Sequence, residues 1–128
     1  NKMAIWTAST AAWLFCTSGS AIFKAGENAD ATATADATNL AIISSEVQGR
    51  IIAETRRDWA ANYSGLPNGI KDVLSLCASC MIANHIIKSN PSGFFPGEAE
   101  FLTNVNYDTA NECIEFLKNF KSNSIQTP

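Results

Sequence analysis

Two cysteines separated by two residues have the greatest capacity for chemistry in this sequence. Cys77-Ala78-Ser79-Cys80 has the spacing of a thiol–disulfide site and of half of a zinc site. In a thioredoxin-type site the pair opens a helix, whose N-terminus lowers the pKa of the first thiol. Here the pair lies about ten residues inside a predicted helix, beyond the first turn in which the helix dipole acts. We therefore expect both thiols to pack as small hydrophobic groups, with redox use as the alternative.

A zinc site would need two ligands besides this pair. Cys16, His85 and Cys113 are the remaining cysteine and histidine candidates, and none stands at a recognised ligand spacing. Four cysteines in a chain of 128 residues are also too few for a secreted disulfide scaffold. We expect reduced thiols and neither a metal nor another cofactor.

The other chemical groups form no catalytic pattern. His85 stands on a mostly apolar helix without a nearby acid–nucleophile pair, so we expect a hydrogen-bonded core histidine. The carboxylates of Glu46, Glu54 and Asp58 share a solvated helix face, where nothing assigns them acid–base roles. The sequence contains no glycine-rich phosphate loop, nucleophile elbow or metal-type histidine pair. We expect that the protein is not an enzyme.

These groups are positioned by a long apolar stretch, residues 66–90. Pro67 suits a first helical position, and Asn90-Pro91 ends the helix because a residue before proline avoids the α region. One side of the helix carries Ile70, Val73, Leu74, Cys77, Met81 and Ala83 or Ile87, and the other carries Leu76, Cys80, Ile82 and Ile86. A helix that is apolar nearly all round is buried between neighbours, so this is the predicted centre of a helical bundle.

This stretch is not expected to span a membrane, because Asp72, Asn84 and His85 interrupt an apolar run that is too short. The mildly apolar start of the chain is broken up by threonine and serine, and Phe15 before Cys16 does not fit a lipoprotein cleavage site. We expect a product made in the cytosol without a signal sequence.

A helix before the central one is predicted to start at Thr38 or Asn39, either of which can cap it. Its apolar stripe keeps steps of three and four, as Leu40, Ile43, Val47, Ile51, Thr55 and Trp59. On the opposite side Glu46 and Arg50 form an attractive i,i+4 pair. Gly49 destabilises the helix relative to alanine and marks a candidate close crossing with another helix.

A helix after the central one is predicted to start at Gly97 or Glu98, with acids in its first turn where the helix dipole favours them. Its stripe is Phe101, Val105, Ala110, Cys113, Phe116 or Leu117, and Phe120. The polar run 104–108 weakens the middle of this stripe, but one continuous helix is the preferred interpretation.

The segments outside these helices are predicted to be extended or irregular. Residues 1–24 place aromatic side chains on both sides of a Thr-Ser-Gly-Ser turn at 17–20, so a short β-hairpin or an extended arm is expected. Residues 25–37 are small, polar and acidic and predict a long loop. The loop before the last helix presents Phe94 and Phe95, which either cap the end of the bundle or form a binding patch.

Together these elements predict a mainly α fold: a small three-helix bundle with an N-terminal extended arm or short β-hairpin, long loops and a C-terminal tail. The length suits one domain, with arm and loop at 1–37, helical bundle at 38–121 and tail at 122–128. The charged fraction of 16% is low, so we expect much of the surface to contact other protein. A net charge of −3 argues against binding nucleic acid through its phosphates.

AETRRDWAANYSGL at 53–66 is followed by the long apolar helix, a Ser/Gly loop and EAEFL at 98–102. AGENA at 25–29 and the closing helix at 113–117 extend this pattern over most of the chain. The order and lengths of these segments resemble the head–tail connector (adaptor) proteins of tailed bacteriophages, although no single motif is specific to that family.

The resemblance implies a non-enzymatic virion protein of the phage neck, made in the host cytoplasm. Proteins of that family are small helical bundles that form a ring, typically of twelve subunits, between the portal protein and the tail or stopper protein. DNA passes through the ring without specific binding, and no membrane is involved. The residues expected to contact partners are Trp6, Trp13, Phe94, Phe95 and Ile125.

Two other functions remain open from the sequence. The chain can be a small cytosolic protein-binding module of an immunity or regulatory type, with Phe94 and Phe95 as its contact. It can also be a thiol or zinc protein that uses Cys77 and Cys80.

Overall fold

Four α-helices and two short 3₁₀ helices make up the part of the chain that the computed structural model describes, residues 12–29, 31, 34, 36–61, 63–89 and 91–120. The α-helices are α2 (Ser18–Ala25), α4 (Ala37–Thr55), α5 (Asn68–Ser89) and α6 (Glu98–Asn119), and the 3₁₀ helices are η1 (Tyr63–Gly65) and η2 (Pro91–Gly93). These residues contain no β-strand. The prediction of a mainly α fold built as a small helical bundle is confirmed.

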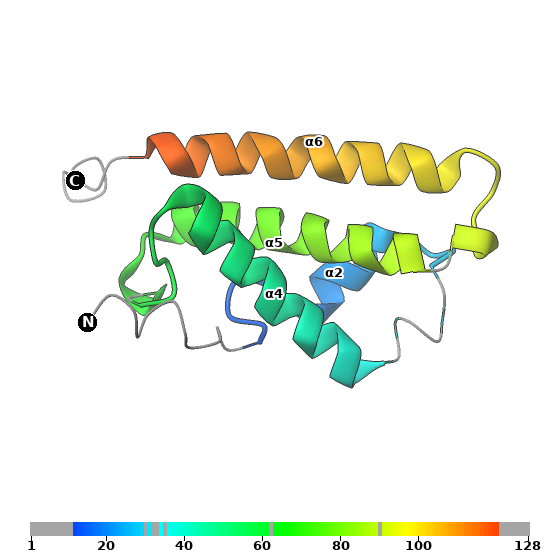
Figure 1. Cartoon of the computed structure of the whole chain (residues 1–128), viewed down its shortest axis with the longest axis horizontal. Helices are drawn as coiled ribbons and strands as arrows, with labels where there is room; N and C mark the ends of the chain where they lie inside the picture. The colour runs from blue at the N-terminus through cyan, green and yellow to red at the C-terminus, as the bar shows by residue number, and fades with distance from the viewer. Residues whose placement is uncertain are drawn as a thin grey trace.

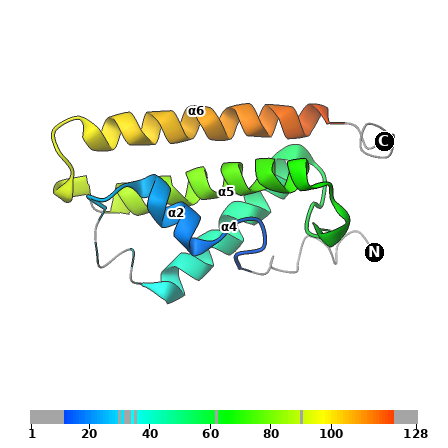
Figure 2. The same ribbon diagram turned by 180° about the vertical axis from the view of Figure 1, so that it is seen from behind.

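The central position of α5 is the feature that organises the bundle. In Figure 1, α6 runs antiparallel alongside α5 and α4 crosses its front, while Figure 2 shows α2 on the face of α5 opposite α4. Eleven α5 residues are buried: Ile70, Leu74, Cys77, Ala78, Ser79, Cys80, Ile82, Ala83, Asn84, Ile86 and Ile87. The prediction of an apolar helix enclosed by its neighbours is therefore confirmed, with Pro67 accepting the first hydrogen bonds, from the N–H groups of Ile70 and Lys71 at 3.1 Å each.

By length and composition, α5 is the one helix in the described residues that could cross a membrane, with a mean hydropathy of 1.4 over its most apolar window. The expectation that Asp72, Asn84 and His85 leave an apolar run too short to cross a membrane is therefore wrong on length and composition alone. The bundle buries 61% of that window, and the core helix of a soluble protein passes the same test of length and composition.

The start and end of α4 differ from the prediction. Asp36 caps the helix by accepting a hydrogen bond from the Asn39 N–H, so α4 begins at Ala37. The helix ends at Thr55 because Arg56 adopts the left-handed conformation, with φ of 59°. Trp59 therefore lies beyond the helix, where it is 1% exposed and its Nε1 donates to Thr55 Oγ1 at 2.8 Å.

Two further expectations for α4 were wrong. A Cβ added at Gly49 would meet no atom within 4 Å, so this glycine does not mark a close helix crossing. Arg50 pairs with Glu54, one turn later, rather than with Glu46. The Arg50 Nε lies 2.8 Å from Glu54 Oε2, and both side chains are largely exposed.

The last helix is continuous from Glu98 to Asn119, as predicted. Its buried face agrees with the predicted stripe at Ala110, Cys113 and Leu117, but not in the first half of the helix. Phe101, Val105 and Phe116 are 66%, 44% and 50% exposed. The face toward the core carries Asn106, Ala110, Cys113, Ile114 and Leu117. Asn106 is buried and donates from Nδ2 to the Lys24 carbonyl at 3.4 Å, so a polar residue occupies the core face in the middle of the helix.

The predicted β-hairpin is wrong in the described part of the N-terminal segment, where residues 18–25 form α2. Thr17 has extended backbone and its Oγ1 accepts a hydrogen bond from the Ser20 N–H, so the predicted turn is a helix cap instead. Gly26, with φ of 93°, ends this helix. Residues 25–37 are not entirely loop either, because Ala25 and Ala37 belong to helices and Ala31 and Thr34 are helical. The bundle thus contains a fourth helix that the periodicity did not predict.

Two buried polar side chains of α4 hold the backbone that precedes α2. Gln48 Oε1 accepts from the Phe15 N–H at 2.7 Å, and Ser44 Oγ accepts from the Trp13 N–H at 2.9 Å. Both side chains are fully buried. These bonds replace the strand pairing that a hairpin would have supplied, and Phe15 and Cys16 enter the core as a result.

Candidate functional site

The four thiols are packed in the core rather than placed for reaction. Cys77 and Cys80 lie on α5 with 0% and 2% exposure, and the Cys77 Sγ lies 3.8 Å from Met81 Sδ and from the Ala110 carbonyl oxygen. Burial raises the pKa of Cys77, Cys80 and Cys113, and raises the pKa of Cys16 from its ordinary 9.0 to about 11. Because the thiolate is the nucleophile and the metal ligand, these protonated thiols are poorly suited to either role.

The described residues also contain no group of three or more histidine, cysteine, aspartate or glutamate side chains placed to hold a metal ion. Cys77 and Cys80 are free thiols, as are Cys16 and Cys113.

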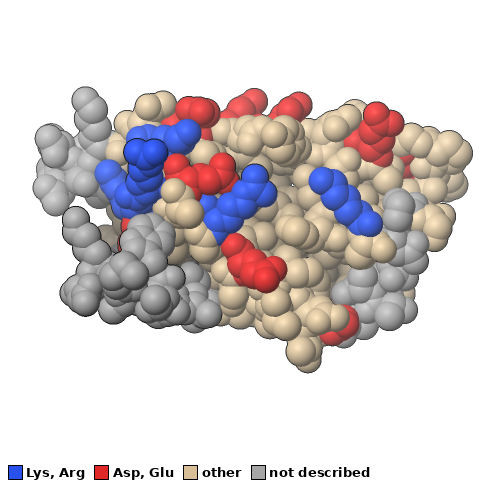
Figure 3. Space-filling view, viewed as in Figure 1, with Lys and Arg blue, Asp and Glu red and all other residues tan. Residues whose placement is uncertain are grey.

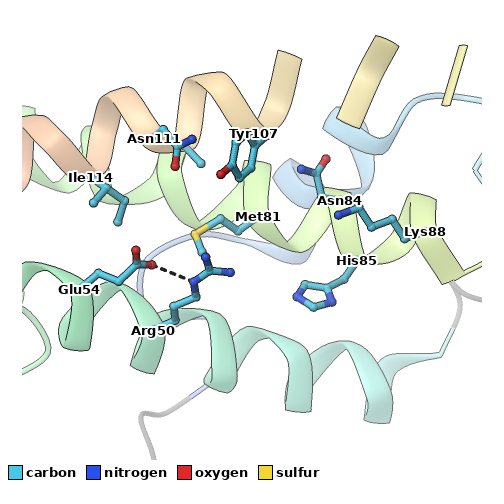
Figure 4. Close-up of a pocket in the computed structure, with 10 residues that line it drawn as sticks. Arg50, Glu54, Met81, Asn84, His85, Lys88, Tyr107, Asn111 and Ile114 are labelled. Atoms are coloured by element: carbon cyan, nitrogen blue, oxygen red, sulfur yellow. Dashed lines mark hydrogen bonds and ion pairs between the residues drawn. The ribbon is translucent and has the colours of Figure 1, made fainter. Parts of the chain in front are cut away.

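His85 is exposed, so the prediction of a core histidine was wrong. Its helix is apolar nearly all round, but His85 points toward the wedge between α4 and α5 (Figure 4). Partial desolvation lowers the pKa of the ring, and the Lys88 and Arg50 charges lower it further, against an opposing effect of Glu46. At neutral pH the imidazole is therefore uncharged in a local field dominated by cations.

A cleft of about 170 Å³ lies where α4, α5 and α6 diverge, and we call it the α4–α5–α6 cleft (Figure 4). Its lining comprises Arg50 and Glu54 from α4, Met81, Asn84, His85 and Lys88 from α5, and Tyr107, Ala110, Asn111 and Ile114 from α6. The cleft combines an apolar floor with charged groups at its rim. No sequence motif indicates this cleft, because its residues come from three helices.

The polar groups of the cleft do not form a catalytic arrangement. Arg50 and Glu54 neutralise each other as an ion pair, and His85 makes no hydrogen bond among the described residues. Asn84 donates from Nδ2 to the Thr103 carbonyl at 3.2 Å, while its buried Oδ1 has no partner in the described part of the chain. The arrangement can bind a carboxylate through its cations, but it provides neither a nucleophile nor an activated base.

The residues predicted to contact partners fall into different environments. Phe94 is 9% exposed and caps the end of the bundle, whereas Phe95 is 71% exposed. Trp13 is half-buried against the core. Trp6 and Ile125 lie outside the described residues. Among the three members of the predicted set that the structure describes, only Phe95 lies mostly on the surface.

The outward face of α6 carries a second group of exposed apolar side chains. Five exposed residues follow one another at steps of three and four, and we call them the outer α6 stripe: Phe101, Val105, Asp108, Glu112 and Phe116. The steps place them on one side of the helix. The sequence pattern assigns Phe101, Val105 and, as an alternative to Leu117, Phe116 to the core face, so it does not predict this stripe.

Comparison with protein-family models, curated proteins and solved structures finds no match to this chain.

Proposed function

We propose that this protein is a structural subunit of a head–tail adaptor ring, which joins the portal of a tailed bacteriophage to its tail or next neck ring. The observation that carries the proposal is the outer α6 stripe, which leaves three large apolar side chains in water along one helix. Phe101, Val105 and Phe116 are 66%, 44% and 50% exposed. The resemblance in the order and lengths of the segments supports the same function.

Exposed apolar side chains also occur on other elements. Phe23 on α2, Ile42 on α4 and Phe95 before α6 are each more than half exposed. Contiguous apolar surface marks contact sites for other proteins, whereas single exposed residues need no explanation, so these three add less to the proposal than the outer α6 stripe does. A subunit with a neighbour on each side and a ring above and below it requires several such contacts.

The chemistry of the chain is compatible with a purely structural role. The thiols are buried and protonated, and the α4–α5–α6 cleft holds no nucleophile beside a base. Subunits of such a ring bind a portal protein on one side and a tail or stopper protein on the other. A net charge of −3 favours the free passage of DNA through the lumen, because the protein as a whole does not attract phosphates.

Imaging of the purified full chain, alone and mixed with the portal of the same phage, tests the proposal. We expect ring-shaped particles by negative-stain electron microscopy, and their loss in the double variant Phe101→Ser, Phe116→Ser. Circular dichroism of that variant should stay helical, because both side chains are exposed in the monomer. Monomers alone under all conditions, with the portal present, would contradict the proposal.

One observation favours a second function, that of a small protein-binding module. Phe95 is 71% exposed in a loop between two helices, as expected for a contact residue. Phe95→Ser should abolish capture of a partner and leave the fold unchanged. Phe94 cannot serve in the same test, because it is buried and its replacement would destabilise the bundle.

A further inference from the structure

The outer α6 stripe carries charges that have no partner within the subunit. Asp108 and Glu112 are exposed between the apolar residues of the stripe, and neither forms an ion pair within the described residues. Figure 3 shows acidic side chains following the edge of the molecule that α6 forms. A surface that mixes exposed phenylalanine with unpaired carboxylates fits a partner surface that is apolar and cationic.

The α4–α5–α6 cleft combines apolar side chains with a net positive charge, because Arg50 and Lys88 outnumber Glu54 in its lining. Lys88 is exposed at its rim and forms no ion pair among the described residues. Arg50 bonds Glu54 through Nε, and Figure 4 shows its guanidinium group directed from α4 into the cleft. Met81 and Ile114 supply apolar surface to the same cleft.

A single copy cannot bring these two surfaces together. The cleft uses Ala110 and Ile114 of α6, whereas the stripe includes Glu112 of the same helix. At 3.6 residues per turn, Glu112 points about 200° away from Ala110 around the helix axis. The complementary surfaces therefore lie on different sides of the molecule, which is the condition for a head-to-tail contact between copies.

We propose that the α4–α5–α6 cleft of one copy receives the outer α6 stripe of a second copy, with Asp108 and Glu112 on Lys88 and Arg50. This inference rests on the proposed ring function and names the lateral contact of that ring. Because the two surfaces differ, the contact is heterologous, and it closes into a ring when the rotation between neighbours divides a full turn.

Charge reversal on each side, followed by mixing, tests this contact. Lys88→Glu destroys the cleft and keeps the stripe, while Glu112→Lys destroys the stripe and keeps the cleft. Each variant alone should assemble about tenfold or more weakly than the unmodified chain in mass photometry, because like charges then face each other. Mixed in equal amounts, the two should assemble with alternating subunits, because the intact cleft of one variant meets the intact stripe of the other and the two reversed charges also attract each other.

The double variant Lys88→Glu, Glu112→Lys should recover assembly, because the charges are exchanged across the contact. Matched controls are Lys118→Glu and Glu27→Lys, which reverse the same types of charge at exposed positions outside both surfaces. Neither control should reduce assembly, and higher salt should weaken the unmodified contact.

The outcomes separate this inference from the ring function. Rings that persist in both single variants would overturn the proposed contact and leave the ring function standing. A mixture of the two variants that stays monomeric while the unmodified chain assembles would do the same. Failure of the unmodified chain to assemble, even on the portal, would overturn both.

Discussion

Burial decides the chemistry of the cysteines. A thiol that loses its hydration is harder to ionise, and all four cysteines of this chain are buried. Cys77 and Cys80 both lie on the enclosed part of α5. Their two-residue spacing therefore places two thiols in the core and does not indicate a reactive pair.

We predict that the folded protein reacts slowly with a thiol reagent at pH 8 and that all four thiols react after unfolding in urea. Stability should also fall as the pH rises. The pKa of Cys16 is about 11 when folded and 9.0 ordinarily, so above pH 9 the unfolded chain loses protons that the folded chain keeps. Urea unfolding should show this loss between about pH 9 and pH 11, and rapid labelling of the folded protein at pH 8 would contradict the prediction.

Gln48 provides a second test at the level of single residues. Its Oε1 accepts from the buried Phe15 N–H, so Gln48→Met should leave that donor without a partner and lower the free energy of unfolding by about 1–3 kcal/mol. Glu46→Met is the matched control on the exposed side of the same helix and should change stability much less. Equal effects of the two variants in urea unfolding would show that the bond to Phe15 contributes little.

Within the elements, two glycines have opposite roles although neither is distinguished by the local pattern. Gly49 lies inside α4 with open space where a Cβ would stand, whereas Gly26 ends α2 with φ of 93°. A Cβ at Gly26 would lie 3.4 Å from Leu102 Cδ1. The first glycine is a weakness in a helix, and the second is required by the turn.

We therefore predict that Gly49→Ala raises the free energy of unfolding by about 1 kcal/mol, since alanine has the higher helix propensity. Gly26→Ala should lower it by about 1–2 kcal/mol, because alanine disfavours a positive φ. Thermal and urea unfolding of both variants measure the difference. A destabilised Gly49→Ala protein would mean that another helix does approach α4 at this point.

At the scale of the molecule, α6 separates folding from assembly. Its inner face completes the core through residues such as Leu117, and its outer stripe faces solvent. Arg57 fixes the end of this helix by donating from Nη2 to the Phe120 carbonyl at 3.1 Å and by lying over the Trp59 and Phe120 rings. The orientation of the whole stripe is thus tied to the connection after α4.

The two faces of α6 should respond differently to substitution. Leu117→Ala is expected to cost about 2–5 kcal/mol of stability, because it opens a cavity in the core. Phe101→Ser should change stability by less than about 1 kcal/mol and weaken assembly instead, because its side chain is mostly exposed. Urea unfolding and mass photometry on each variant measure both properties. A large loss of stability in Phe101→Ser would place that side chain in the core.

Some parts of this fold follow from the sequence alone. The apolar residues on nearly all sides of 66–90 and the proline near each end determine α5 and its buried position, because a helix that is apolar nearly all round must be enclosed. Gly97 and the acids after it determine where α6 begins. These features are local, so neighbouring residues suffice to define them.

Other parts depend on contacts between distant residues. Thr17 caps a helix rather than opening a hairpin because Ser44 and Gln48 of α4 bind the backbone before it. Asn106 occupies the core face of α6 because it reaches the Lys24 carbonyl, and this polar residue hid the buried stripe from the periodicity. The sequence by itself determined the central helix and the helical class. The tertiary structure decided which face of α6 meets the core and where the cleft lies, because both depend on partners that are far apart along the chain.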